Sequence, residues 1–110
     1  MKPHAIMIIT HNPHLRAQLK AAVSPHPTVE FDSHREAGVG FRNHRIIGIV
    51  YHNGDDEDAL DWAKNANLEH QIPTIVVSHK QPATVIGPNI KIVPSGNGYL
   101  ETIRQFFTKK

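Results

Sequence analysis

The sequence predicts an α/β fold in which helices cover both faces of a parallel sheet. Five short hydrophobic runs alternate with segments whose apolar residues recur at helical spacing, and this alternation is typical of strand–helix–strand units with right-handed crossovers. Most of these runs show no polar alternation, which indicates strands buried on both faces. Because 110 residues provide for one hydrophobic core, we expect residues 1–110 to form a single domain.

The first strand and helix have the clearest signals. Residues 5–9 are entirely aliphatic or methionine, which predicts a buried strand. Asn12 is then an N-cap candidate with Pro13 at the first helical position. Helical spacing of apolar side chains follows, at Leu15, Leu19, Ala22 and Val23.

The second strand and helix are less certain in their pattern. Residues 28–31 form a short strand, and Ser33 with Glu36 has the spacing of a capping box. The helix that follows is predicted to bury Ala37 and Phe41. Two glycines inside it each cost about 1 kcal/mol, so this is the weakest helix of the chain.

The second half repeats the alternation with one gap. Residues 46–50 predict a strand, and the acidic segment at residues 55–58 suits the positive end of a following helix. Strands follow at residues 74–77 and 90–93. Prolines and glycine between residues 79 and 89 leave no room for a full helix, so the fourth helix is shortened or missing. The apolar positions of the two remaining helices are Ala59, Leu60, Ala63 and Ala66 in the first, and Leu100, Ile103 and Phe107 in the second.

Three predicted strands run into a histidine, at His11, His52 and His79. Parallel strands share one carboxyl rim, where open α/β sheets place their ligands. Three neutral imidazoles suit zinc or nickel and leave a coordination position open, so a metal or anion site is one hypothesis. A second is that they are ordinary polar residues at the start of exposed loops. A third is a pH sensor, because clustered imidazoles repel one another once charged.

The order of the elements and the segment Ile-Pro-Thr-Ile-Val-Val-Ser at residues 72–78 resemble the receiver domain of two-component response regulators, over nearly the whole chain. The resemblance implies a flavodoxin-like (CheY-like) three-layer sandwich with a five-stranded parallel sheet in the order 2-1-3-4-5. A typical receiver has paired acidic residues after the first strand and a phosphoacceptor aspartate after the third. It also has a serine or threonine after the fourth strand and a lysine after the fifth.

Most of these receiver positions hold other residues here. Thr10, His11 and Asn12 stand in place of the acidic pair, Tyr51 or His52 in place of the phosphoacceptor, and Pro94 or Ser95 in place of the lysine, while Ser78 alone matches. Aspartyl phosphorylation needs a carboxylate nucleophile and a divalent cation, so we expect it to fail. Asp55 and Asp56 follow a turn, and we expect them to cap the next helix. Tyr51 either fills the emptied pocket as a fixed plug or covers the rim of the sheet.

The resemblance therefore implies an atypical receiver, or pseudo-receiver, that is not an enzyme and needs no cofactor. Its expected function is regulation by contact with other protein domains in signalling or transcriptional control, as the N-terminal domain of a longer regulator with a C-terminal output domain. Receivers often dimerise near their last helix, and an apolar stripe there predicts a homodimer surface. The alternative is that the two phenylalanines belong to a frayed C-terminus. The stripe comprises Tyr99, Ile103, Phe106 and Phe107.

The alternative function is a small metal-binding protein or enzyme that uses the histidine rim, although no carboxylate close in sequence supports the ligands and no nucleophile is paired with a base. A flavin site is disfavoured because residues 10–12 lack an extended phosphate-binding loop. The formal charge of +2 is scattered, so we expect no direct nucleic acid binding. No apolar run approaches a membrane span, and the lack of cysteine excludes disulfides, so we expect a cytoplasmic protein.

Overall fold

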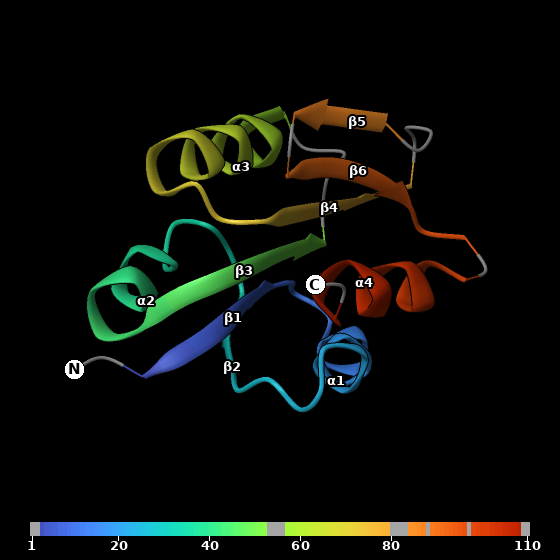
Figure 1. Ribbon diagram of the computed structural model, residues 1–110, viewed down its shortest axis with the longest axis horizontal. Helices are drawn as coiled ribbons and strands as arrows, with labels where there is room; N and C mark the ends of the chain where they lie inside the picture. The colour runs from blue at the N-terminus through green and yellow to red at the C-terminus, as the bar shows by residue number, and fades with distance from the viewer. Residues whose placement is uncertain (1–2, 53–56, 80–83, 88, 97, 109–110) are drawn as a thin grey trace.

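The computed structural model describes residues 3–52, 57–79, 84–87, 89–96 and 98–108 (Figure 1). Within these ranges the chain forms a six-stranded sheet with the strand order β2-β1-β3-β4-β6-β5. The elements are β1 (His4–Ile9), α1 (Pro13–Ala22), β2 (Thr28–Phe31), α2 (Gly38–Asn43), β3 (Arg45–His52), α3 (Glu57–His70), β4 (Thr74–Ser78), β5 (Thr84–Gly87), β6 (Ile90–Pro94) and α4 (Tyr99–Thr108).

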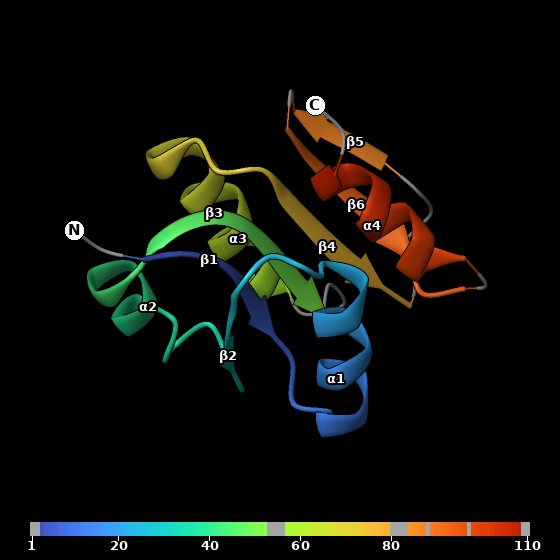
Figure 2. The ribbon, with the colours of Figure 1, turned by 60° about the horizontal axis from the view of Figure 1, so that its bottom comes forward.

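The sheet lies between two helical layers, as the sequence predicted. Helices α1 and α4 pack beside each other on one face, while α2 and α3 cover the other (Figures 1 and 2). Strand β1 shows why its sequence is so apolar. Ala5, Met7 and Ile9 pack on the α2 and α3 side, while Ile6 and Ile8 pack on the α1 and α4 side. All five are buried, so the prediction of strands buried on both faces is confirmed for β1.

Helix α1 begins where the sequence predicted. The Asn12 side chain has its Oδ1 2.9 Å from the amide nitrogen of His14 and 3.2 Å from that of Leu15, and it accepts both hydrogen bonds. Pro13 occupies the first helical position, where its missing N–H costs nothing. Leu19 and Ala22 then point into the core beneath the sheet.

Helix α2 begins later than predicted, and the Ser33–Glu36 capping box does not start it. Its N-cap is Ala37, which makes no side-chain capping bond, and the preceding residues form turns instead. The helix packs tightly on the sheet, because a Cβ on Gly40 would lie 2.8 Å from Met7 Cε and 2.9 Å from Phe31 Cε2. The glycine that weakens the helix therefore lets it approach β1 and β2 closely.

The sheet has one strand more than the five that were predicted. Strand β5 runs antiparallel to β6 at the edge of the sheet, with Thr84 opposite Ile92 and Val85 opposite Lys91. This strand lies between β4 and β6 in the sequence, where a typical receiver has its fourth crossover helix. Three β-branched residues, Thr84, Val85 and Ile86, precede Gly87, and this composition favours a short edge strand.

Helix α4 includes Phe106 and Phe107, and both pack against the core, which argues against the alternative of a frayed end there. Ile103 is fully buried in the core beside α1. Phe107 lies against Gly48 of β3, where a Cβ would be 2.4 Å from the ring. On the other face, Ala63 and Ala66 of α3 are buried as predicted, whereas Asp55, Asp56 and the side chain of Ala59 lie outside the described residues. None of the helices in the described part of the chain is long and apolar enough to cross a membrane.

Candidate functional site

The predicted pocket residues lie at the carboxyl rim of the sheet. Strands β1, β3 and β4 run in the same direction (Figure 2), and the register pairs Ile9 with Tyr51 and Ser78 with Pro94. The strand ends therefore bring together positions that are far apart in the sequence. These positions are Thr10, His11, Asn12, Tyr51, His52, Ser78 and Pro94.

The rim residues that follow the first strand make hydrogen bonds with the backbone. Thr10 is 2% exposed, its N–H donates to the carbonyl of Phe31 at 3.0 Å, and its hydroxyl accepts from the N–H of Asn12 at 3.2 Å. Asn12 in turn caps α1, while His11 points to solvent. The hydrogen bonds of Thr10 and Asn12 thus stabilise the turn between β1 and α1.

An ion pair that the sequence did not predict lies beside this turn. Arg16 of α1 donates from Nη2 to the Thr10 carbonyl at 2.9 Å and to the carboxylate of Asp32, which follows β2. The guanidinium therefore places a fixed positive charge next to the residue that replaces the acidic pair. Arg16 and Asp32 are sixteen residues apart, so local sequence patterns gave no signal for the contact.

Tyr51 is held in one orientation at the end of β3. Its side chain is 3% exposed, and its hydroxyl lies 2.6 Å from Nδ1 of His34. The ring meets that of Trp62 edge-on, with centroids 5.8 Å apart. Tyr51 thus packs into the core on the α2 and α3 side and does not lie loosely over the rim. The orientation fits the hypothesis of a fixed side chain.

Two of the three rim histidines meet. The rings of His52 and His79 have centroids 5.3 Å apart at an angle of 86°. His79 Nδ1 is also 2.5 Å from the hydroxyl of Ser95, whose N–H donates to the carbonyl of Ser78. Among the residues that the structure describes, no three histidine, aspartate or glutamate side chains are grouped to hold a metal ion. This conformation therefore lacks the three-ligand site predicted from His11, His52 and His79.

The predicted interaction stripe on α4 divides into core and surface residues. Ile103 is fully buried and cannot contact a partner, which corrects its assignment to the stripe. Tyr99, Phe106 and Phe107 are half-buried, and the Lys91 ammonium lies 5.2 Å from the centroid of the Phe106 ring. Partial burial raises the pKa of the Tyr99 hydroxyl above its ordinary value.

Comparison with known proteins identifies the fold. No protein-family model and no curated protein matches the sequence. The structure is similar to the crystal structure of a response regulator from Thermotoga maritima, with a TM-score of 0.71 and 14% sequence identity. The similarity covers 99% of this chain and 100% of that one. The chain therefore has the flavodoxin-like fold of a receiver domain.

Proposed function

We propose that this chain is a regulatory signalling domain that acts by contact with other protein domains and without phosphorylation. The observation that carries the proposal is the state of the third-strand end, where a receiver has its phosphoacceptor. Tyr51 is buried there and its hydroxyl is within hydrogen-bond distance of His34, and among the described residues no carboxylate stands at this strand end. Neither its phenol nor the neighbouring imidazole of His52 can form an aspartyl phosphate.

The surroundings of this position support the same proposal. Magnesium at a receiver site needs oxygen ligands, chiefly carboxylates. Asp32 is the carboxylate that the described residues bring close to Thr10, and it is bonded to Arg16. Because Arg16 already pairs with the Asp32 carboxylate, that carboxylate does not offer a divalent cation an unpaired negative charge.

The face formed by β5, β6 and α4 is the surface that we propose for partner contact. A groove of about 350 Å³ crosses it, between Val85 of β5 and Tyr99 of α4. Val85 is 76% exposed and Ile86 is 36% exposed, which is unusual for large apolar residues on adjacent positions of an edge strand. We propose that a second copy or an output domain in the same chain covers this face. We also propose that the protein is cytoplasmic.

Two measurements on the purified chain test the proposal. Acetyl phosphate with magnesium should cause no mass increase and no change in the amide spectrum by NMR, because Tyr51 stands where a receiver has its phosphoacceptor. Sedimentation over a range of concentrations should show a dimer that Val85→Asp disrupts. Leu68→Asp is the matched control, because Leu68 is 74% exposed but lies on α3. A phosphorylated species would refute the proposal, as would a monomer at all concentrations that also binds no output domain.

A second candidate function rests on the contact between His52 and His79. Two imidazoles at this spacing are a partial ligand set for zinc or nickel, and the chain would then be a metal-binding protein or an enzyme. Calorimetric titration with zinc separates the two candidates. Micromolar binding that the double variant His52→Ala, His79→Ala abolishes would favour the metal function, whereas no heat of binding would leave the interaction module.

A further inference from the structure

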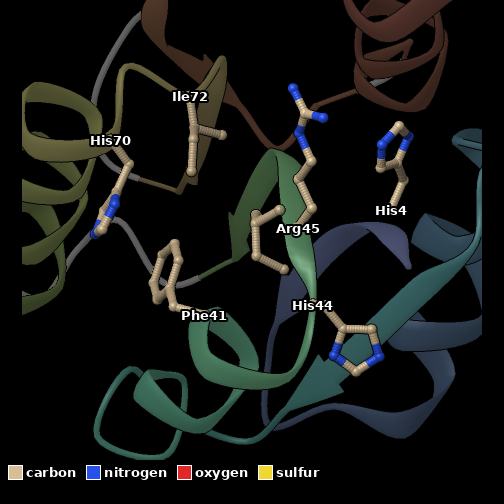
Figure 3. A pocket seen from close by; sticks show the side chains of 7 residues that line it. His4, Phe41, His44, Arg45, His70 and Ile72 are labelled. Carbon is tan, nitrogen blue, oxygen red and sulfur yellow. The ribbon is translucent and has the colours of Figure 1, made fainter. Parts of the chain in front are cut away.

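A pocket lies at the amino ends of β1 and β3, at the opposite end of the strands from the receiver-like rim (Figure 3). Its volume is about 470 Å³, which is within the range of about 300–1,000 Å³ that is usual for small-molecule sites. Ile46 and Ile72 line its apolar part, and both are nearly buried. Neither the rim residues nor the β5, β6 and α4 face contribute to it.

One wall of the pocket is basic. His4 and Arg45 are the first residues of β1 and β3 and are partners in the sheet register. The Arg45 N–H donates to the carbonyl of Pro3 at 2.9 Å, so the backbone under the wall is fixed. Figure 3 shows the two side chains extending to the same side from adjacent strand ends.

The other wall is flat and aromatic. The rings of Phe41 and His70 are stacked, with centroids 4.5 Å apart and an interplanar angle of 14°. They come from the ends of α2 and α3, and Figure 3 shows them on the side of the pocket away from Arg45. Such a surface suits the apolar or planar part of a ligand.

An unsatisfied polar atom lies in the same lining. His44 joins α2 to β3, and its Nδ1 is buried without a hydrogen-bond partner among the residues that the structure describes. Buried polar atoms almost always have a partner. Because this nitrogen has almost no exposed surface, a ligand can reach it only after the His44 side chain turns toward the pocket.

The charges of the lining select the chemistry of the ligand. Arg45 is the permanent cation, three histidines offer further N–H donors, and no carboxylate is among the lining residues described. The acidic group next to them is Glu69, whose Oε2 is 3.9 Å from His70 Nε2. Guanidinium and imidazole N–H groups bind phosphate and carboxylate oxygens well. We propose that this pocket binds a small organic oxyanion, with its charged group on the Arg45 wall and its body against Phe41 and His70.

The test is an NMR titration of the ¹⁵N-labelled protein with phenyl phosphate, benzoate, phenol and inorganic phosphate as probes. Phenyl phosphate or benzoate should shift the amides of residues 44–46 and 70–72 at lower concentration than phenol does. Whichever of the two anions binds more tightly identifies phosphate or carboxylate as the preferred group. Anion binding that is no tighter than phenol binding, or shifts that appear only elsewhere, would overturn the proposal.

Two arginine variants show whether the contact is specific. Arg45→Ala should weaken binding of the preferred anion about tenfold, the loss expected for a hydrogen bond to a charged group. Arg42→Ala removes the same charge from the exposed face of α2, outside the pocket lining, and should leave the affinity unchanged. Equal weakening by both variants would overturn the proposal in favour of a general charge effect. His44→Ala, with its fold checked by circular dichroism, should also weaken binding, and unchanged affinity would count against the proposed lining.

Discussion

The contact between Gly48 and Phe107 makes a sharp prediction about what fixes α4 on the sheet. In the variant Gly48→Ala the new Cβ would be 2.4 Å from Cε1 and 2.9 Å from Cδ1 of Phe107. Carbon atoms in contact lie about 3.5–4.0 Å apart, so the ring must move by about 1 Å. Its neighbours restrict that movement, because the Phe106 ring lies edge-on to it with centroids 5.0 Å apart. The substitution therefore overpacks the α4 side of β3.

The size of the effect follows from two opposing terms. Overpacking a core costs about 1–3 kcal/mol, while replacing glycine by alanine lowers the entropy of the unfolded chain and returns about 0.4–1 kcal/mol. We expect the free energy of unfolding to fall by about 1–2 kcal/mol, with a decrease in Tm of roughly 5–10 °C for a domain of this size. Urea denaturation followed by fluorescence measures it, because Trp62 is the single tryptophan of the chain.

A double-mutant cycle decides whether Phe107 is the cause. In a Phe107→Ala background, Gly48→Ala should no longer destabilise, which corresponds to a coupling free energy of about 1–2 kcal/mol. Gly38→Ala is the matched control, because a Cβ on Gly38 would meet no atom within 4 Å. It lies in a helix, so alanine should stabilise or be neutral there. Additivity of the two substitutions within about 0.5 kcal/mol would refute the reasoning.

Three further predictions concern hydrogen bonds and one ionisable group. Tyr51→Phe removes the hydroxyl that contacts His34 and should lower the free energy of unfolding by about 1 kcal/mol. It should also change the fluorescence emission of Trp62, and unchanged emission and stability would contradict the contact. Asn12→Ala should cost about 1 kcal/mol by urea denaturation, because the N-cap of α1 is lost, and Asn12→Ser should restore most of it. Burial raises the pKa of Tyr99, so the folded state holds the phenolic proton more tightly than the unfolded state does. This contribution to stability is present below the ordinary tyrosine pKa of about 10 and is lost as pH rises through the raised pKa. Denaturation curves measured between pH 9 and 11.5 should therefore show a smaller fall in the free energy of unfolding for Tyr99→Phe than for the original chain.

The parts of the fold that the sequence predicted well are those set by local chemistry. Residues 5–9 of β1 and 75–77 of β4 are all apolar because helices cover both faces of the sheet. Asn12 and Pro13 specify the start of α1 without help from distant residues. Helical spacing also identified α3 and α4 and placed Phe107 on the buried side of α4, where the structure packs it against Gly48.

The errors occurred where distant contacts override a local pattern. Ser33 and Glu36 have the spacing of a capping box, yet α2 starts where Gly40 can approach Met7. The edge strand β5 was not predicted because the prolines and glycine around it are typical of a loop, although three of the residues between them are β-branched and favour a strand. At the rim, Arg16 comes from α1 and Asp32 from the end of β2, so their contact depends on the fold itself.

The two ends of the strands differ in how readily they could bind an anionic ligand. At the carboxyl rim, Thr10, Asn12 and Tyr51 each have a hydrogen-bond partner within the protein, and binding a phosphoryl group there would break contacts that support α1 and the core. At the amino ends of the strands, the pocket lining described here has one arginine, three histidines and no carboxylate, so an anion would gain contacts there. Binding to the native state alone raises stability by RT ln(1 + [L]/Kd), so phenyl phosphate at 100 times its Kd should raise the free energy of unfolding by about 2.7 kcal/mol. The Arg45→Ala variant should show the same increase only at about tenfold higher ligand concentration, and equal responses of the two proteins would contradict an anion site at this edge.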